Sequence, residues 1–277
     1  MITCPSVKKS VIRSHYNVGT LFYRLLWGPH LHHGLWSHDE SPQVAARQLT
    51  EELARLARID SAQRIVDVGC GMGGSSIWLA RERACSVTGV TISPVQRRWA
   101  ATSSWLKGTS GRTHFLHADA EQLQLEAGSR DVVWSIECTE HLFDKAAFFT
   151  KARSWLAAGG RVAICAWLCG HDQQSALTKK LVTEVCEGFF CPSLGTQADY
   201  EGWLEGAGLK MEHSLLWTER VLKTWEICRD RVRRSGVRHL ARLLGRDHVL
   251  FLDRFDAILE AYRTRSMEYG CFVATAA

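Results

Sequence analysis

From residue 63 onward, short apolar runs alternate with helical patterns, and this alternation limits the chain to few folds. The apolar runs predict strands at 65–68, 86–90, 113–117, 131–136 and 161–167, with helices at 73–83, 94–106 and 145–156 between them. Because these strands are apolar throughout, both faces of their sheet must be covered. The pattern therefore predicts an α/β fold with a mostly parallel sheet and helices on both faces.

The flanking segments predict helices around this core. Residues 7–37 are rich in aromatic residues and histidine, which predicts one or two short helices and a turn near Gly28-Pro29, and Ser41-Pro42 begins another helix. Later patterns predict helices at 173–190, 197–207, 219–245 and 247–264, and strands at 210–217 and 267–275. We expect a single domain over 1–277, with an N-terminal helical cap (1–58), a core (59–167) and lid helices with C-terminal strands (168–277), in which the inserted helix 173–190 covers the carboxyl ends of the strands.

Composition excludes several protein classes. The chain is 46% hydrophobic and 23% charged, which is ordinary for a globular protein. Its longest apolar run, Val162–Cys169, is far shorter than the roughly 20 residues of a membrane-spanning helix. The N-terminus lacks a signal-peptide pattern, and the ten cysteines include no CxxC pair. We therefore expect reduced thiols and a cytoplasmic location.

A glycine-rich turn follows the first core strand and carries the strongest chemical signal. Asp67, Gly69, Gly71 and Gly73 alternate with other residues, and the next helix begins there. Glycine permits a tight turn and lets a ligand approach a helix N-terminus closely. The spacing suits a dinucleotide or S-adenosylmethionine (SAM). Asp67 favours SAM, because its charge attracts a sulfonium and an ammonium but repels a pyrophosphate.

The ends of the later strands also favour SAM. No carboxylate follows the strand that ends at 89–93, where NAD needs one, although Arg97 or Arg98 leaves NADP as an alternative. Asp119, after the third strand, can accept a hydrogen bond from an adenine amino group. The fourth strand runs into Glu137 next to the first strand, where open α/β sheets bind ligands.

Four motifs together resemble class I SAM-dependent methyltransferases that act on small molecules, the group of the γ-tocopherol, sterol and related natural-product enzymes. They are VDVGCGMGGSS, VTGVTISPVQ, HADAEQL and VVWSIECTEHLFDK. The resemblance implies a Rossmann-like fold with a seven-stranded, mostly parallel sheet containing one antiparallel strand, and SAM as cofactor. Residue by residue it implies cofactor binding by Asp67, Gly69, Gly71, Thr91, Ser93, Gln96, Asp119, Ala120 and Ser135.

Candidate catalytic residues follow the fourth strand and lie in the cap. Glu137 is the first candidate for a general base, with bonding to the SAM ammonium or to a backbone amide as its alternative. His141 is a second candidate, although it could instead cap the next helix. His33 and Trp36 are expected to close over SAM and the acceptor, or else to pack between cap and sheet. We expect no metal, since the histidines of 30–38 lack further ligands at suitable spacing except Asp39.

Two further segments bear on the acceptor. The aromatic residues of one face of the N-terminal helical pattern, Tyr16, Phe22, Tyr23 and Trp27, could wall an apolar acceptor pocket or belong to the core. Residues 220–246 hold nine basic residues against Glu226 and Asp230. This stretch could be a solvated helix face, a peripheral contact with anionic lipid, or a contact with an anionic substrate. Nucleic acid is not expected as a partner, and the sequence does not indicate an oligomeric state.

The sequence thus predicts SAM-dependent methyl transfer to a small hydrophobic acceptor, with C-methylation of an isoprenoid or prenylated aromatic as the first choice. O- or N-methylation of a natural product, such as an alkaloid, polyketide or sugar-bearing metabolite, is the alternative. Cyclopropane-type chemistry, an NADP-dependent oxidoreductase and a non-catalytic SAM-binding protein are more distant. Leu216, before Trp217, stands where the tocopherol-like branch tends to have an acidic residue, so a plain tocopherol substrate is not implied.

Overall fold

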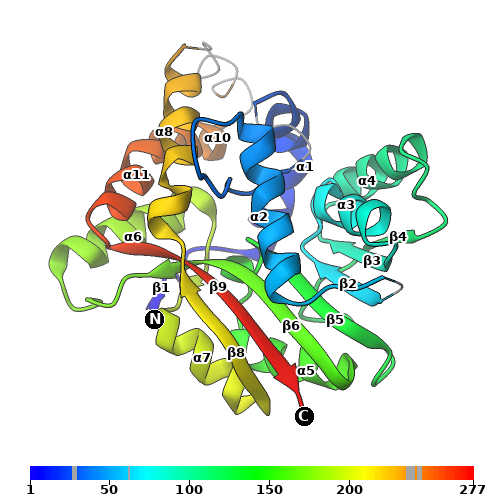
Figure 1. Ribbon diagram of the computed structural model, residues 1–277. Helices are drawn as coiled ribbons and strands as arrows, with labels where there is room; N and C mark the ends of the chain where they lie inside the picture. The colour runs from blue at the N-terminus through cyan, green and yellow to red at the C-terminus, as the bar shows by residue number, and fades with distance from the viewer. Residues whose placement is uncertain (27–29, 62, 235–240, 242–244) are drawn as a thin grey trace.

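The computed structural model describes residues 1–26, 30–61, 63–234, 241 and 245–277, and its centre is a seven-stranded sheet (Figure 1). The strands lie in the order β4-β3-β2-β5-β6-β9-β8. Their bounds are β2 Arg64–Val68, β3 Ser86–Thr91, β4 Thr113–His117, β5 Arg130–Ile136, β6 Leu156–Cys169, β8 Leu209–Leu216 and β9 Met267–Ala276. Within this sheet β9 pairs antiparallel with both neighbours, and the other pairs are parallel. The predicted sheet is confirmed, and β6 is longer than expected.

Helices cover both faces of the sheet, because successive residues of its strands point to opposite sides. Ile65 and Val132 pack in one core with α2 (Pro42–Leu56) and α3 (Gly74–Glu82). Val66 and Val133 pack in a second core with α5 (Lys145–Trp155) and α7 (Gln197–Gly206). The helix α4 (Pro94–Leu106) packs against β3 and β4. The continuous apolar strands are therefore explained by burial on both faces.

The first part of the cap forms one long helix, where the sequence predicted one or two short helices over 7–37. Helix α1 spans Lys9–Leu26, and the predicted turn near Gly28-Pro29 lies outside the described residues. Helix α2 begins as predicted, with the Ser41 hydroxyl accepting a hydrogen bond from the amide of Val44. A two-stranded sheet that the sequence did not predict joins β1 (Ile2–Thr3) to β7 (Ser193–Leu194). It holds the start of the cap against the segment that follows α6.

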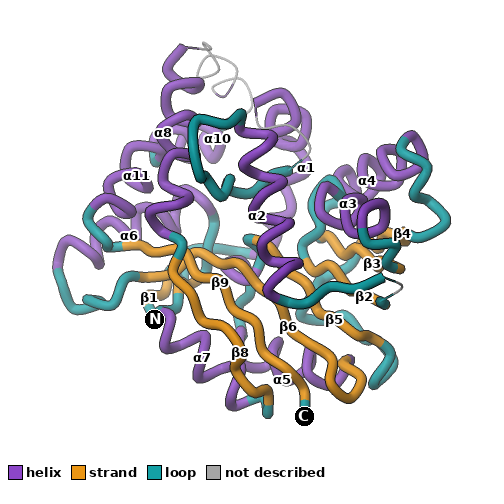
Figure 2. The backbone as a smooth tube through the Cα atoms, in the orientation of Figure 1, coloured by secondary structure: helices purple, strands orange, loops and turns teal. Residues whose placement is uncertain are grey.

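The remaining helices gather on the side of the molecule that also carries α1 (Figure 2). They are α6 (Ala176–Phe189), α8 (Thr218–Arg234), α10 (Arg246–Asp253) and α11 (Phe255–Arg263). The helix predicted at 247–264 is divided at Arg254, which ends α10 and precedes α11. Most of the chain predicted to continue α8 to residue 245 lies outside the described residues.

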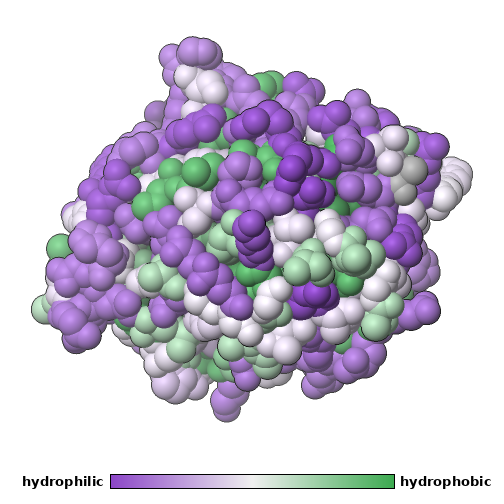
Figure 3. Space-filling view, turned by 60° about the horizontal axis from the view of Figure 1, so that its bottom comes forward, coloured by the Kyte–Doolittle hydropathy of each residue, from purple (hydrophilic) through white to green (hydrophobic). Residues whose placement is uncertain are grey.

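The surface mixes hydrophilic and hydrophobic residues (Figure 3). Among the large apolar side chains that the structure describes, Trp105 and Leu106 at the end of α4 are the most exposed, each with about 70% of its area accessible. Of the described helices, none combines the length and apolar character needed to cross a bilayer. All ten cysteines are free, and nine of them are buried.

Candidate active site

The glycine turn after β2 depends on backbone conformations that favour glycine. Gly69, Gly71 and Gly73 have φ angles of +79°, +53° and +81°. An added Cβ at Gly69 would lie 2.2 Å from the Cβ of Cys138, so the turn packs directly on the segment after β5. At Gly71 the nearest such contact is 3.8 Å, to Leu31 Cδ1. The backbone at Gly69 is therefore packed against Cys138, whereas the backbone at Gly71 has free space beside it.

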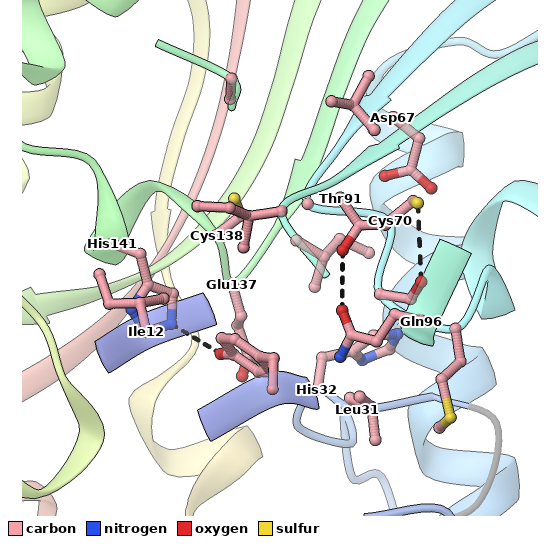
Figure 4. A pocket seen from close by; sticks show the side chains of 18 of the residues that line it. Ile12, Leu31, His32, Asp67, Cys70, Thr91, Gln96, Glu137, Cys138 and His141 are labelled. Carbon is pink, nitrogen blue, oxygen red and sulfur yellow. Dashed lines mark hydrogen bonds between the residues drawn. The ribbon is translucent and has the colours of Figure 1, made fainter. Parts of the chain in front are cut away.

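A cavity lies beside this turn (Figure 4), and the space free of protein atoms there, open solvent included, is about 1020 Å³. It is bounded by α1, by the segment after α1, and by the carboxyl ends of β2, β3, β4 and β5. The residues predicted to bind the cofactor that line this cavity are Asp67, Gly69, Gly71, Thr91, Gln96, Asp119 and Ala120. Thr91 donates a hydrogen bond to the Gln96 side chain over 2.9 Å, as Figure 4 shows. We name this space the cofactor cavity, and the roles of these residues there stay predictions.

Three predicted cofactor-binding residues are not among the residues that line this cavity, and each has another partner. The Ser93 hydroxyl caps α4 through the amide of Gln96 and donates to Asn17 Oδ1 over 2.7 Å. The Ser135 hydroxyl donates to the carbonyl of Val68 over 3.0 Å. Trp36 Nε1 donates to Thr224 Oγ1 over 2.8 Å, which places the indole against α8. Each of these polar atoms has a hydrogen-bond partner within the protein, and the cofactor contacts predicted for the three residues stay predictions.

Lys9 of α1 is a residue of this cavity that sequence reasoning missed. Its ammonium lies 2.7 Å from Asp119 Oδ2 and 2.6 Å from Glu121 Oε2. Burial alone would lower the pKa of Lys9, but the two carboxylates raise it above its ordinary value. No local pattern could reveal this contact, since Lys9 is separated from its partners by more than 100 residues. These ion pairs join α1 to the segment that follows β4, on the border of the cofactor cavity.

Asp67 is a buried carboxylate at the end of β2, and the Ser76 hydroxyl donates to it over 2.5 Å. Burial raises the pKa of Asp67 to about 7. A cationic ligand beside this carboxylate would compensate the cost of its buried charge. A buried carboxylate next to an open glycine turn therefore fits the ammonium of SAM.

We expect the stability of the ligand-free protein to depend on pH through Asp67. Its pKa is higher in the folded state (about 7) than unfolded (3.8), so stability is lost as the pH rises between these values. In Asp67→Asn this loss is absent. Urea unfolding at several pH values should show the stability difference between variant and wild type growing by up to about 4 kcal/mol over this range. A constant difference would contradict the assigned burial of the charge.

A second cavity, which we name the acceptor cavity, adjoins the first and holds about 650 Å³ free of protein atoms. Both are lined by Tyr16, Leu31, His32, Glu137 and His141. Its other walls include the rings of Trp167, Phe189, Trp225 and Phe251. The ring centroids of Trp167 and Phe189 are 5.3 Å apart, and those of Phe189 and Trp225 are 5.2 Å apart. Among its described lining residues there is no Lys or Arg.

Of the predicted aromatic stripe, Tyr16 lines both cavities. The other positions of the stripe lie where the structure describes no side chain, at 22, 23 and 27.

Glu137 stands where the two cavities meet, in a left-handed backbone conformation with φ of +52°. Its Oε1 accepts from the His33 amide (2.7 Å) and the Tyr269 hydroxyl (2.8 Å), and its Oε2 accepts from Trp167 Nε1 (3.0 Å). Burial alone would raise the pKa of Glu137, but the neighbouring His33 ring and the donated hydrogen bonds lower it to about 2. Glu137 therefore binds a backbone amide, which was the predicted alternative to a role as general base. A carboxyl group with so low a pKa is a poor general base near neutral pH.

His33 and His141 differ in their surroundings. His33 Nδ1 lies 2.9 Å from Glu137 Oε1, although not in the orientation of a regular hydrogen bond, and its ring packs among aromatic rings in the acceptor cavity. His141 Nδ1 faces the carbonyl of Phe190 over 3.1 Å, so this nitrogen carries the proton and Nε2 accepts from the Tyr16 hydroxyl. Burial lowers the pKa of His141 to about 4. It is neutral at physiological pH, and it lines both cavities.

The described residues contain no group of three or more His, Cys, Asp and Glu side chains placed to hold a metal ion. In the described part of the basic stretch, several cations already have acidic partners. Lys223 pairs with Asp39, Arg229 with Asp230, and Arg233 with Asp256. Residues 235–240 and 242–244 lie outside the described residues, so a contact of this stretch with lipid or substrate stays a prediction.

Sequence comparisons relate the chain to methyltransferases. A family model described as a methyltransferase domain matches residues 66–164. The chloroplastic tocopherol O-methyltransferase of Arabidopsis thaliana is 28% identical over 94% of this chain and 80% of that protein. The 27-O-demethylrifamycin SV methyltransferase of Amycolatopsis mediterranei is 29% identical over 85% of this chain and 86% of that protein.

Solved structures share the whole fold. The [4+2]-cyclase SpnF matches with a TM-score of 0.85 and 21% identity, over 99% of this chain and 98% of that chain. The geranyl diphosphate C-methyltransferase of Streptomyces coelicolor A3(2), solved with S-adenosylhomocysteine (SAH), matches with a TM-score of 0.78 and 19% identity over 99% of both chains. The methyltransferase domain and the methyltransferase relatives contradict the alternative of an NADP-dependent oxidoreductase. The glycine turn, the methyltransferase domain and the sequence relatives together show that this chain is a SAM-dependent methyltransferase, and the solved structures show that it has the class I methyltransferase fold.

Proposed function

We propose that the protein methylates a nucleophilic carbon of an uncharged, hydrophobic acceptor, a prenylated aromatic compound. The observation that carries this proposal is the lining of the acceptor cavity. It combines aromatic rings with the carboxyl groups of Glu137 and Glu140, and its described residues include no Lys or Arg. The cavity meets the cofactor cavity at Glu137 and His141, where methyl donor and acceptor would come together.

The charge of this lining favours a reaction in which the acceptor becomes positive. A neutral aromatic carbon that takes up a methyl cation carries positive charge until it loses a proton. Aromatic faces attract cations, by about 0.5–2 kcal/mol for each well-placed ring. The ionised Glu137 adds a negative charge at the border of the two cavities. A phenolate acceptor of O-methylation begins as an anion, and the same lining would disfavour its binding.

Among isoprenoids, the cavity favours an uncharged compound over a prenyl diphosphate. A diphosphate is usually bound through charge-assisted hydrogen bonds from Arg or Lys. Such side chains are missing from the described lining. The Streptomyces coelicolor neighbour binds geranyl diphosphate, so its shared fold does not carry its substrate over to this chain.

SAM supplies the electrophilic methyl group, and the protein supplies position. Asp67, Gly69 and Gly71 would hold the amino-acid end of the cofactor, and Asp119 with Ala120 would frame its adenine. Holding donor and acceptor in line converts a bimolecular reaction into a unimolecular one, which contributes much of the acceleration. N-methylation of a neutral amine is the second candidate, because an amine also becomes positive on methylation and suits the same lining.

The test is methyl transfer from isotope-labelled SAM to a prenylated quinol, geranyl diphosphate and a hydrophobic secondary amine. Mass spectrometry detects each product, and fragmentation locates the methyl group on carbon, oxygen or nitrogen. We expect ring-methylated quinol, formed with kcat/KM at least about tenfold above that for the diphosphate, a difference of about 1.4 kcal/mol in the barrier. Faster methylation of the diphosphate, or methylation of the quinol on oxygen alone, would overturn the proposal.

A further inference from the structure

A second carboxyl group lines the acceptor cavity, and one of its oxygens has no partner. Glu140 belongs to the short 3-10 helix η1 (Thr139–His141) that follows β5. Only 1% of its surface is exposed. Oε1 accepts a hydrogen bond from the amide of Trp167, which fixes the orientation of the carboxyl group. Oε2 is buried with no hydrogen-bond partner among the described residues.

A buried oxygen without a partner is costly, by about 1–3 kcal/mol for a neutral group and more for a charged one. A buried polar atom without a partner therefore calls for an explanation, such as a catalytic role or a bound molecule that supplies the missing bond. The ammonium of Lys145, whose charge acts on Glu140, donates instead to the Leu142 carbonyl (2.8 Å) and the Ser193 hydroxyl (2.7 Å). Because Glu140 lines the acceptor cavity, a hydroxyl group of the acceptor can supply the missing bond to Oε2.

The two carboxyl groups of the acceptor cavity have opposite character. Burial raises the pKa of Glu140 to about 8, and the charge of Glu137 contributes to this rise. Glu137, by contrast, is held ionised by its donors. When the surroundings shift the pKa values of two carboxyl groups in opposite directions, one group can transfer a proton while the other stays ionised. His141 does not compete for the first role, because its Nε2 is already occupied by the Tyr16 hydroxyl.

We propose that Oε2 of Glu140 binds a hydroxyl group of the acceptor and accepts its proton during methyl transfer. This inference rests on the proposed function and names the acceptor as a phenol. The ring carbon forms a bond to the methyl group, the bond from sulfur to methyl breaks with its electrons left on sulfur, and the phenolic proton passes to Glu140. The resulting dienone loses its ring proton to solvent and regains a proton on oxygen from Glu140. Overall, a ring hydrogen is replaced by methyl and one proton is released.

The experiment compares a prenylated phenol with its methyl ether in wild type and in Glu140→Gln. Glutamine keeps an oxygen for the Trp167 amide but cannot accept a proton from the acceptor. We expect wild type to prefer the phenol, and Glu140→Gln to lower kcat for the phenol by about 100-fold, as is usual for loss of a general base. Wild-type kcat/KM should rise with pH towards about 8 as Glu140 ionises, and the variant should lose this rise. Glu205→Gln, an exposed carboxyl on α7, is the matched control.

Binding to the SAH complex, measured by calorimetry, separates this inference from the proposed function. If wild type binds the phenol more tightly than the ether, and Glu140→Gln removes the difference without changing SAH affinity, then Glu140 recognises the hydroxyl even where no product forms. Absence of product from every aromatic acceptor would overturn the proposed function alone. Equal binding of phenol and ether by wild type, no binding of the phenol, or an unchanged kcat and pH profile in Glu140→Gln would overturn the role of Glu140.

Discussion

Replacing Gly69 by alanine should weaken SAH binding by at least about 100-fold, or about 2.7 kcal/mol. The new Cβ would lie 2.2 Å from the Cβ and 2.4 Å from the Sγ of Cys138. These atoms belong to the segment after β5, which also lines the cofactor cavity, so either the turn or that segment must move. The φ of +79° adds strain that alanine tolerates poorly. Calorimetric titration with SAH measures the loss.

Gly108→Ala is the matched control for the backbone strain. Gly108 has a φ of +68°, but an added Cβ there would meet nothing within 4 Å. We expect this variant to lose about 1–2 kcal/mol of stability and to bind SAH like wild type. If Gly69→Ala also bound SAH like wild type, the close packing of the turn on Cys138 would not matter for the cofactor.

Glu137→Ala should destabilise the protein by about 3–5 kcal/mol, the usual cost of removing one partner from a buried charged network. The truncation leaves the His33 amide, the Tyr269 hydroxyl and the Trp167 indole without their common acceptor. It also releases the segment after α1 from the sheet. Denaturant unfolding at pH 7 measures the stability, and methyl transfer should be lost with the shared wall of the two cavities.

Glu137→Gln tests the charge with little change in shape. The pKa of Glu137 is lowered from 4.5 to about 2 in the folded state, so its charge stabilises the protein above the unfolded value and this contribution is lost as the pH falls through the folded value. The stability deficit of Glu137→Gln should therefore be full at pH 7 and shrink between about pH 4.5 and 2. A deficit that does not change with pH would show that the carboxylate acts by shape alone.

The sheet and the cofactor turn were predictable because their signals are local. The apolar runs predicted β2, β3, β4 and β5 from a few residues each, and the resemblance implied a seven-stranded sheet with one antiparallel strand. The turn was predictable from the spacing of its glycines, because Gly69 and Gly71 occupy the positions where the backbone has a positive φ. The cap that Ser93 forms was also predictable from a local signal, because a serine directly before a proline often caps the helix that begins there.

The remaining site could not be predicted, because its contacts join distant segments. Glu137 binds His33, Trp167 and Tyr269, which come from the cap, β6 and β9. In the sequence, each of these residues could equally be a buried residue of the hydrophobic core. The unpartnered oxygen of Glu140 is visible only once the fold encloses it. Sequence reasoning therefore located the ends of the strands, but it could not show that Glu137 has several hydrogen-bond donors while Glu140 keeps an unpartnered oxygen.

The small sheet of β1 and β7 has a consequence for the order of folding. Its strands are separated by about 190 residues, and the amide of Cys4 extends the pairing to the carbonyl of Pro192. During synthesis the start of the cap must wait for this partner, while β2 to β5 are already complete. Closing so long a loop is slow. The nascent chain should therefore form the floor of its cofactor site before its N-terminal helix is fastened in place.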